Sequence, residues 1–369
     1  MNQLFRWDQT GLFLLALAAG ILPFAVPEVC AAALREGLTL CSGPLLLSLF
    51  PFLVVSRLLV QCPESDLLAM PFRLAAWGIG IRTPCAARVL CIGFLGGFAP
   101  AASAAAQAVR TGQLTVEEAD ALLPACICSG PSFVVLTVGQ SLLGSAELGV
   151  LLFASQITAN YLTAALLNRF AGVRSVKPGS AAPASPAPLR LDEILADAAI
   201  TYCKLCGFIL FFRMLAAGAG TLLPAGAGTL CAVLLEVCSG CDLASRTGRW
   251  GSLLCCAALS VQGLSVLLQV RTICPPEMTL RPLYRSRLLH LPLSLALFYL
   301  LLPGGEADVF STLPARVLLM RRVPPDCALL VFAVCCMAAC ALRSGIRQVE
   351  QKQMARNAGG CCINSKTLL

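Results

Sequence analysis

LLPACICSGPSFVVLTVGQSLLGSAELGVLLFASQITAN, residues 122–160, is the stretch that decides the fold of this chain. It is apolar enough to lie in a membrane, yet a Ser-Gly-Pro-Ser sequence, Ser129–Ser132, interrupts it. Proline removes a backbone donor and glycine weakens a helix, so the pattern predicts a broken helix. Irregular backbone at membrane depth needs protein or a water-filled cavity around it, and broken helices of this kind mark the solute sites of transporters.

The composition of the whole chain indicates a polytopic all-α membrane protein. Hydrophobic residues make up 58% of the 369 residues and charged residues only 12%, with a mean hydropathy of +0.82, whereas soluble domains carry about 25% charged residues. A β-barrel would alternate in polarity along short segments, and the unbroken apolar run Leu291–Leu302 does not. At about 20 residues per span, we expect about eight spanning helices plus re-entrant or broken half-helices.

The distribution of charge and of cysteines argues against nucleic-acid binding and against metal binding. The net charge of +8 comes from basic residues at the ends of apolar segments, where the positive-inside rule places them, so no nucleic-acid partner is predicted. Most of the 21 cysteines lie within apolar runs, where they act as small hydrophobic side chains. Because His290 is the only histidine, the two CxxC spacings, at Cys203 and Cys238, predict no metal site and no cofactor.

The chain divides into two membrane halves. We expect an N-terminal half over residues 1–170, a Pro/Ala/Ser-rich linker over 171–190, a C-terminal half over 191–342 and a basic cytoplasmic tail over 343–369. A basic loop from Arg271 to Arg287 is assigned to the cytoplasmic side. The expected helical segments are Gly11–Val26, Leu38–Leu59 with a kink at Pro51, Leu67–Ile81, Arg82–Val109, a capped helix from Thr115, Gly149–Phe170, one ending near Leu215, Gly226–Ser245, Trp250–Val270, Leu288–Leu302 and Asp326–Leu342.

Each half contains a short segment interrupted by Ser-Gly, at Ser129-Gly130 and at Ser239-Gly240. Paired interruptions are typical of pseudo-symmetric transporters. The free N–H groups of a broken helix can bind a polar or anionic group, although small residues also serve helix packing. We therefore expect the two interruptions to meet. The candidate solute-binding residues are Ser129, Gly130, Pro131, Ser132, Gln156, Asn160, Glu236, Ser239, Gly240, Gln262 and Gly263.

Glu236 is the candidate for a substrate or proton contact, because it lies inside the apolar segment LCAVLLEVCSG. A carboxylate at that depth costs at least about 2.5 kcal/mol, so it must be paired, hydrated, protonated or held by backbone donors. The alternative is a structural ion pair with Lys204 or Arg213. Gln156, Asn160 and Gln262 are neutral hydrogen-bonding groups in apolar spans, and packing between helices explains many such amides.

The ordered motifs SLFPFLVVSRLL, GFLGGFAP, LTVEEA, CSGPSF, SQITANYL, LLEVCSG, LSVQGLSVLLQV and LYRSRLLH cover about residues 38–300. In this set the chain resembles the YlbJ-like sporulation integral membrane proteins of the Gate, or nucleoside-recognition, group. The resemblance implies a solute carrier of an endospore-forming bacterium, with gate elements at the Ser-Gly breaks, Glu236 and Gln262. It implies a further gate or hinge at Gly96, Gly97 and Pro100.

The sequence predicts a secondary transporter of the bacterial cytoplasmic membrane or of a forespore membrane. Its partners would be the lipid bilayer, a small polar or anionic solute such as a nucleoside or dipicolinate, a proton or sodium ion, and further copies of itself in a homo-oligomer. The first alternative is a non-transporting assembly protein, in which the breaks would be packed dry. A membrane-embedded enzyme is the weakest interpretation, because the sequence has neither a G-x-S-x-G motif nor a P-loop.

Overall fold

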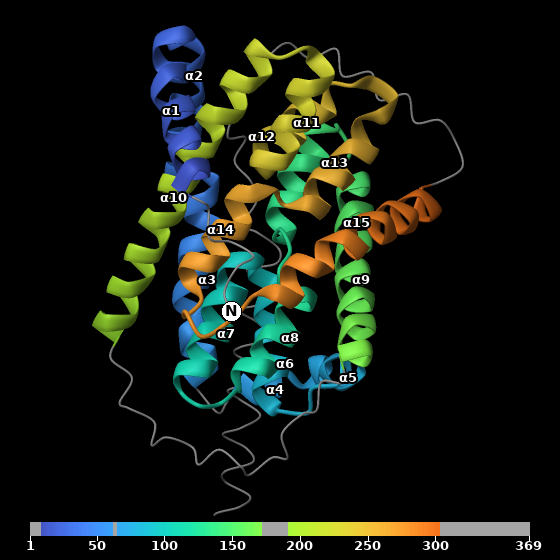
Figure 1. The fold of residues 1–369 in the computed structure, drawn as a ribbon. Coiled ribbons are helices and arrows are strands. Elements are labelled where there is room, and N and C mark those ends of the chain that lie inside the picture. The colour runs from blue at the N-terminus through green and yellow to red at the C-terminus, as the bar shows by residue number, and fades with distance from the viewer. Residues whose placement is uncertain (1–8, 62–64, 172–190, 303–369) are drawn as a thin grey trace, which may run out of the picture.

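A computed structural model describes residues 9–61, 65–171 and 191–302. Within these ranges every regular element is a helix (Figure 1), so the predicted all-α class is confirmed there. The predicted linker within 171–190, the span Asp326–Leu342 and the tail 343–369 lie outside the described residues.

The N-terminal helices differ from the expected pair. The first apolar segment forms α1, Gln9–Ala25, but Pro27 starts a separate helix, α2, Pro27–Ser42, bent by 108° from α1. The predicted helix 38–59 is wrong in its start, because α2 ends before Gly43 and α3, Pro44–Gln61, begins anew at a proline. Two short helices follow, α4, Ser65–Leu68, and α5, Met70–Gly78.

The rest of the first half contains two interrupted helices and one continuous one. The interrupted ones are α6, Pro84–Gly96, with α7, Phe98–Arg110, and α8, Val116–Cys126, with the π-helix η1, Ser132–Leu142; the continuous one is α9, Ala146–Ala171. The predicted cap of α8 is confirmed, since the Thr115 hydroxyl accepts from the Glu118 N–H at 3.1 Å and Glu118 accepts from the Thr115 N–H at 3.2 Å.

The second half repeats this composition of continuous and interrupted helices. It opens with the long helix α10, and closes with α15, whose N-terminal turns contain the predicted basic loop residues 281–287. The elements are α10, Leu191–Leu222, α11, Ala225–Leu235, α12, Val237–Ser245, the short η2, Gly248–Trp250, α13, Gly251–Val261, α14, Gly263–Ile273, and α15, Arg281–Leu301.

Several of these helices fit a multi-pass membrane protein. By length and apolar character, three described stretches could each cross a membrane, and the bent pair of α1 and α2 raises the number to four. The other apolar helices are too short alone, because breaks divide them, so the described residues do not reach the expected eight spans. Large apolar side chains cover the outside, with Phe24 and Phe170 exposed by 89% and 81%, as a lipid environment favours.

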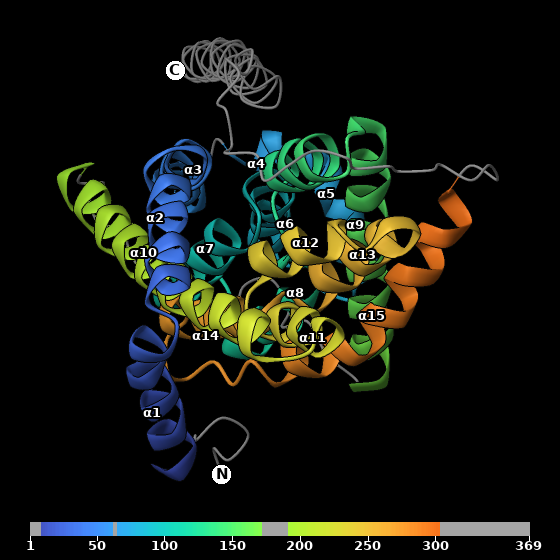
Figure 2. The ribbon, with the colours of Figure 1, turned by 90° about the horizontal axis from the view of Figure 1, so that it is seen from above.

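The interrupted helices lie in the middle of the molecule. Seen from above in Figure 2, α10 and α2 lie on one side and α9 and α15 on the other, with α7, α8 and α12 between them. The largest buried cluster joins both halves and includes Leu122, Leu123, Ala258 and Leu259 beside the breaks. In α7 small residues take most of the buried positions, from Ala99 to Ala106, which lets neighbouring helices approach closely.

Candidate functional site

Four helix breaks form the candidate site. The first break is Gly97, between α6 and α7, and the second is the irregular segment Ile127–Gly130, between α8 and η1. The third break is Glu236, extended between α11 and α12, and the fourth is Gln262, left-handed with φ 63° between α13 and α14. The second break falls at the predicted Ser129-Gly130 interruption. The third lies at Glu236, so the interruption predicted at Ser239-Gly240 is wrong in position, because these two residues are helical within α12. The first and fourth divide the segments 82–109 and 250–270, which the sequence predicts as continuous helices, at gate elements that the family resemblance implies.

The first and second breaks are packed backbone to backbone. Gly97 has φ 81°, and a Cβ atom there would lie 2.6 Å from the Gly130 nitrogen and 3.2 Å from the Cys128 oxygen. A Cβ on Gly130 would in turn lie 3.4 Å from the Gly96 oxygen. Glycine at position 97 is therefore required twice, by its conformation and by the space that the second break occupies.

The third and fourth breaks make a similar contact in the second half. Gly263 directly follows Gln262 and has φ 70°, and a Cβ there would lie 2.9 Å from the Glu236 nitrogen and 3.0 Å from the Leu235 oxygen. In each half, a glycine with positive φ thus lies against an extended stretch of a neighbouring broken helix. The order of the two elements along the chain is reversed between the halves.

Two side-chain amides tie the halves together at the second break. The Ile127 carbonyl accepts from Nδ2 of Asn160 at 3.3 Å and from Nε2 of Gln262 at 3.2 Å. Both side chains are buried, with exposures of 0% and 1%, and Oε1 of Gln262 has no hydrogen-bond partner within the described part of the chain. The sequence predicts both amides as site candidates, and the structure brings them to a single carbonyl group within the break.

Asn160 connects the breaks to a buried cation, Arg287, whose Nη2 donates to Oδ1 of Asn160 at 3.1 Å. Its Nε donates to the Ser286 hydroxyl at 3.3 Å, and its Nη1 has no partner. Arg287 is only 8% exposed, and no carboxylate lies within ion-pair distance of it among the described residues. The assignment of Arg287 to a cytoplasmic loop is therefore wrong, because it lies on the buried face of α15.

A second polar network joins α9, α13 and α15. Nε2 of Gln156 donates to the Ser260 hydroxyl at 2.9 Å, and the Gln156 carbonyl lies 3.2 Å from Nε2 of His290. The Ser260 and Ser294 hydroxyls lie 2.5 Å apart, and Nδ1 of His290 has no hydrogen-bond partner among the residues that the structure describes. Since Gln156 and Asn160 are one helical turn apart on α9, this network continues the one that contains Arg287.

Sequence reasoning missed Arg287 and His290 as site residues, although a signal for them exists. Arg287, His290, Ser294 and Phe298 recur at helical spacing and form one buried face of α15. Polar residues at that spacing within an apolar helix indicate a face turned toward protein or water rather than lipid.

Glu236 caps the helix that follows it and makes no ion pair with Lys204 or Arg213. Its carboxylate accepts from the N–H groups of Cys238 at 2.8 Å and of Ser239 at 2.7 Å, and from the Ser239 hydroxyl at 2.9 Å. Arg213 binds Glu36 instead, at 2.7 Å. The carboxylate thus occupies the N-terminal position of α12 where a bound anion would otherwise lie.

The remaining predicted residues lie near the breaks, but they do not contact one common group as Asn160 and Gln262 do. A Cβ on Gly240 would lie 2.8 Å from the Val233 Cα, so Gly240 serves the packing of α11 on α12, whereas Gly130 lies against Gly96 and Gly97. Pro100 lies next to Gly96, where an added Cβ would be 3.0 Å from the proline ring. Ser129 is buried, whereas Pro131 and Ser132, at the start of η1, are half-buried.

The breaks are closely packed, and two hollows in the described residues lie elsewhere. One is a polar pocket of about 160 Å³ between α3, α7, α10 and α14, and the other an apolar groove of about 540 Å³ between α13 and α15. None of the predicted site residues lines either hollow. Among the described residues, no three His, Cys, Asp or Glu side chains are grouped as metal ligands would be.

Comparison with known proteins adds no assignment at this point. The chain matches no family model, no curated protein and no solved structure.

Proposed function

We propose that this protein is a secondary transporter for a small anionic solute, which passes the four helix breaks and is held there by Arg287. The breaks supply irregular backbone in the middle of the helical bundle, and Asn160 and Gln262 supply neutral hydrogen-bonding groups beside it. Such a combination is typical of solute sites in carriers built from discontinuous helices.

The observation that carries the proposal is the uncompensated burial of Arg287. Removing a cation from water costs several kcal/mol unless an anion and further hydrogen bonds offset the cost. Arg287 has only neutral partners, Asn160 and Ser286, and one free terminal nitrogen. A carboxylate or phosphate group would supply the missing charge and could form a paired, bidentate contact with a guanidinium.

The family resemblance adds the biological setting of the proposal. A YlbJ-like Gate protein would act in sporulation, in the cytoplasmic or a forespore membrane, and a spore-core solute such as dipicolinate would be one anionic substrate. A neutral nucleoside would leave the charge of Arg287 without a counter-ion, so an anion is the better fit. Coupling to a proton or a sodium ion and assembly into a homo-oligomer belong to the same proposal.

One observation favours a second candidate function, that of a non-transporting assembly protein. The breaks are closely packed, and neither described hollow reaches the predicted site residues. In a carrier this state is occluded and must open during transport, whereas in an assembly protein it is permanent.

Uptake into proteoliposomes from a mixture of candidate anions tests the proposal. Small carboxylates and phosphate esters are offered together outside, and mass spectrometry identifies what accumulates inside. We expect selective uptake of at least one anion by the wild-type protein. Arg287→Gln should lower it at least about thirtyfold, because losing one partner of a buried charge pair costs about 2–5 kcal/mol.

Arg285→Gln is the matched control, because Arg285 lies on the same helix but is exposed. It should transport like the wild type. An unpaired buried charge carries a desolvation cost that a neutral glutamine relieves, so we expect Arg287→Gln to remain folded although it loses the hydrogen bonds of Arg287 to Asn160 and Ser286. Uptake of no anion by the intact protein, or equal uptake by Arg287→Gln, would contradict the proposal.

A further inference from the structure

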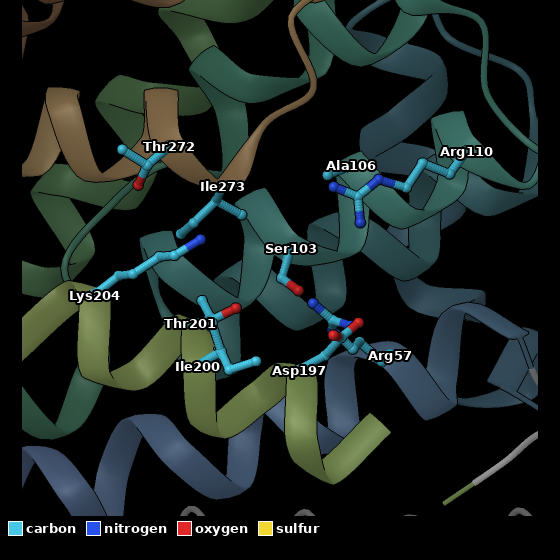
Figure 3. Close-up of a pocket in the computed structure, with 10 residues that line it drawn as sticks. All are labelled: Arg57, Ser103, Ala106, Arg110, Asp197, Ile200, Thr201, Lys204, Thr272 and Ile273. Carbon is cyan, nitrogen blue, oxygen red and sulfur yellow. The ribbon is translucent and has the colours of Figure 1, made fainter. Parts of the chain in front are cut away.

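The polar pocket between α3, α7, α10 and α14 is the strongest additional site in the described residues. Its volume is about 160 Å³, room for several waters or one small anion, since liquid water occupies about 30 Å³ per molecule. Figure 3 shows Lys204 and Arg110 extending toward it from different helices, with Ser103 and Thr201 between them. The four helices also pack against one another, so the pocket has walls on all of these sides.

The pocket is cationic, with three basic side chains and one carboxylate. Arg57 and Asp197 form an ion pair, which leaves an excess of two positive charges. Arg110 and Lys204 have no hydrogen-bond or ion-pair partner among the described residues, and both are exposed to solvent. The hydroxyls of Ser103 and Thr201 add donors at the wall, whereas the Thr272 hydroxyl already donates to the Gln269 carbonyl at 2.8 Å. Two free cations with hydroxyl donors around a small hollow fit a multivalent anion such as phosphate or a dicarboxylate.

The pocket is also lined by residues of two of the broken helices, α7 and α14. α7 begins directly after the first break and reaches the pocket through Ser103 and Arg110. α14 begins directly after Gln262, the fourth break, and reaches it through Thr272. At about 1.5 Å per residue, Ser103 and Arg110 lie about 9 and about 20 Å along α7 from Gly97, and Thr272 lies about 15 Å along α14 from Gln262.

We propose that this pocket is an antechamber that binds the anionic solute at the cytoplasmic mouth of its path, before or after it passes the breaks. This inference rests on the proposed function and assigns the transported anion a second, outer binding site. The cytoplasmic side is assigned from Arg57 and Arg110, which lie near the C-terminal ends of α3 and α7, whereas Lys204 lies within α10. A lipid phosphate shares the chemistry of a free anion, so the test must distinguish these two sources.

Binding of inorganic phosphate to the full chain in nanodiscs tests the antechamber. Nanodiscs of neutral phosphatidylcholine are titrated with phosphate at constant ionic strength, with and without added phosphatidylglycerol. We expect saturable binding that Arg110→Gln/Lys204→Gln weakens about tenfold, since the variant loses two exposed charge contacts with the anion, each of modest strength. Thr272→Glu, which adds a negative charge at the wall, should weaken it as well.

Arg249→Gln/Arg285→Gln is the control, because it removes the same two charges from exposed positions outside the pocket. It should bind phosphate like the wild type. Phosphate binding that the pocket variants leave unchanged, or occupancy by phosphatidylglycerol without phosphate binding, overturns the antechamber.

Arg287→Gln separates the antechamber from the proposed function. It should abolish uptake and leave phosphate binding at the pocket intact. The antechamber alone is refuted if the wild type takes up an anion but the pocket variants change neither phosphate binding nor the KM of uptake. Phosphate binding at the pocket of a protein that transports no anion refutes the proposed function.

Discussion

The side-chain amide of Gln262 donates to the backbone carbonyl of Ile127 over 3.2 Å, across 135 positions of the sequence. This hydrogen bond joins the fourth break to the second and thereby one half of the chain to the other. Asn160 donates to the same carbonyl and accepts from Arg287. The breaks therefore form one connected site, and a change at one break is expected to affect the others.

Replacing Gln262 by leucine should measure the strength of this connection. The variant loses one buried hydrogen bond and also the unpartnered Oε1 of Gln262, so we expect a loss of only about 0.5–1.5 kcal/mol of stability. Asn160→Leu should cost more, because it also removes the partner of Arg287. Thermal unfolding in detergent gives both values. A larger loss for Gln262→Leu than for Asn160→Leu would show that the ranking is wrong.

Gly97→Ala should disrupt the contact between the first two breaks. The added Cβ meets the Gly130 nitrogen at 2.6 Å in a backbone conformation with φ 81°, so strain and overlap add. Gly112→Ala is the control, because Gly112 has φ 70° but no atom within 4 Å of an added Cβ. The control should lose about 1–2 kcal/mol of stability from conformational strain alone, and Gly97→Ala about 1–3 kcal/mol more. Equal unfolding temperatures for the two variants would exclude the close contact.

Glu236→Gln should destabilise the protein through the cap of α12. An amide can accept from only one of the two N–H donors that the carboxylate holds, and its NH₂ group then faces a donor. We expect a loss of about 1–2 kcal/mol, and a smaller loss for Ser239→Ala, which removes only the hydroxyl donor. Unfolding temperatures of the purified variants provide the comparison. Unchanged stability of Glu236→Gln, with altered dependence of uptake on external pH, would instead support the proton-coupling role.

The break at Ser129-Gly130 is predictable from the sequence, because glycine and proline within an apolar segment interrupt a helix. The breaks at Gly97 and Gln262 are indicated only by the family resemblance, and the break in the third segment lies at Glu236 and not at Ser239-Gly240. The capping box of Thr115 and Glu118 is also predictable from the sequence. The partners of the breaks are not, since the Gly97–Gly130 contact and the Ile127 carbonyl depend on how distant helices pack. The sequence predicts a loop at Arg287 because several other arginines lie close to it in the chain. In the structure these residues form the first turns of α15, and Arg287 lies on the buried face of that helix.

Site-resolved labelling of the cysteines tests most directly whether the breaks open to water. Cys128 lies within the second break and is 1% exposed, and Cys255 on α13 is 0% exposed, with its thiol 3.4 Å from the Cys241 carbonyl. The protein is incubated in liposomes with a charged, membrane-impermeant thiol reagent, and mass spectrometry of peptides gives the labelling rate at each cysteine. A transporter that opens at its breaks should label at Cys128 at least about tenfold faster than at Cys255, because only Cys128 would reach water during the cycle. Equal protection of both thiols would contradict the account and favour a protein whose breaks stay packed.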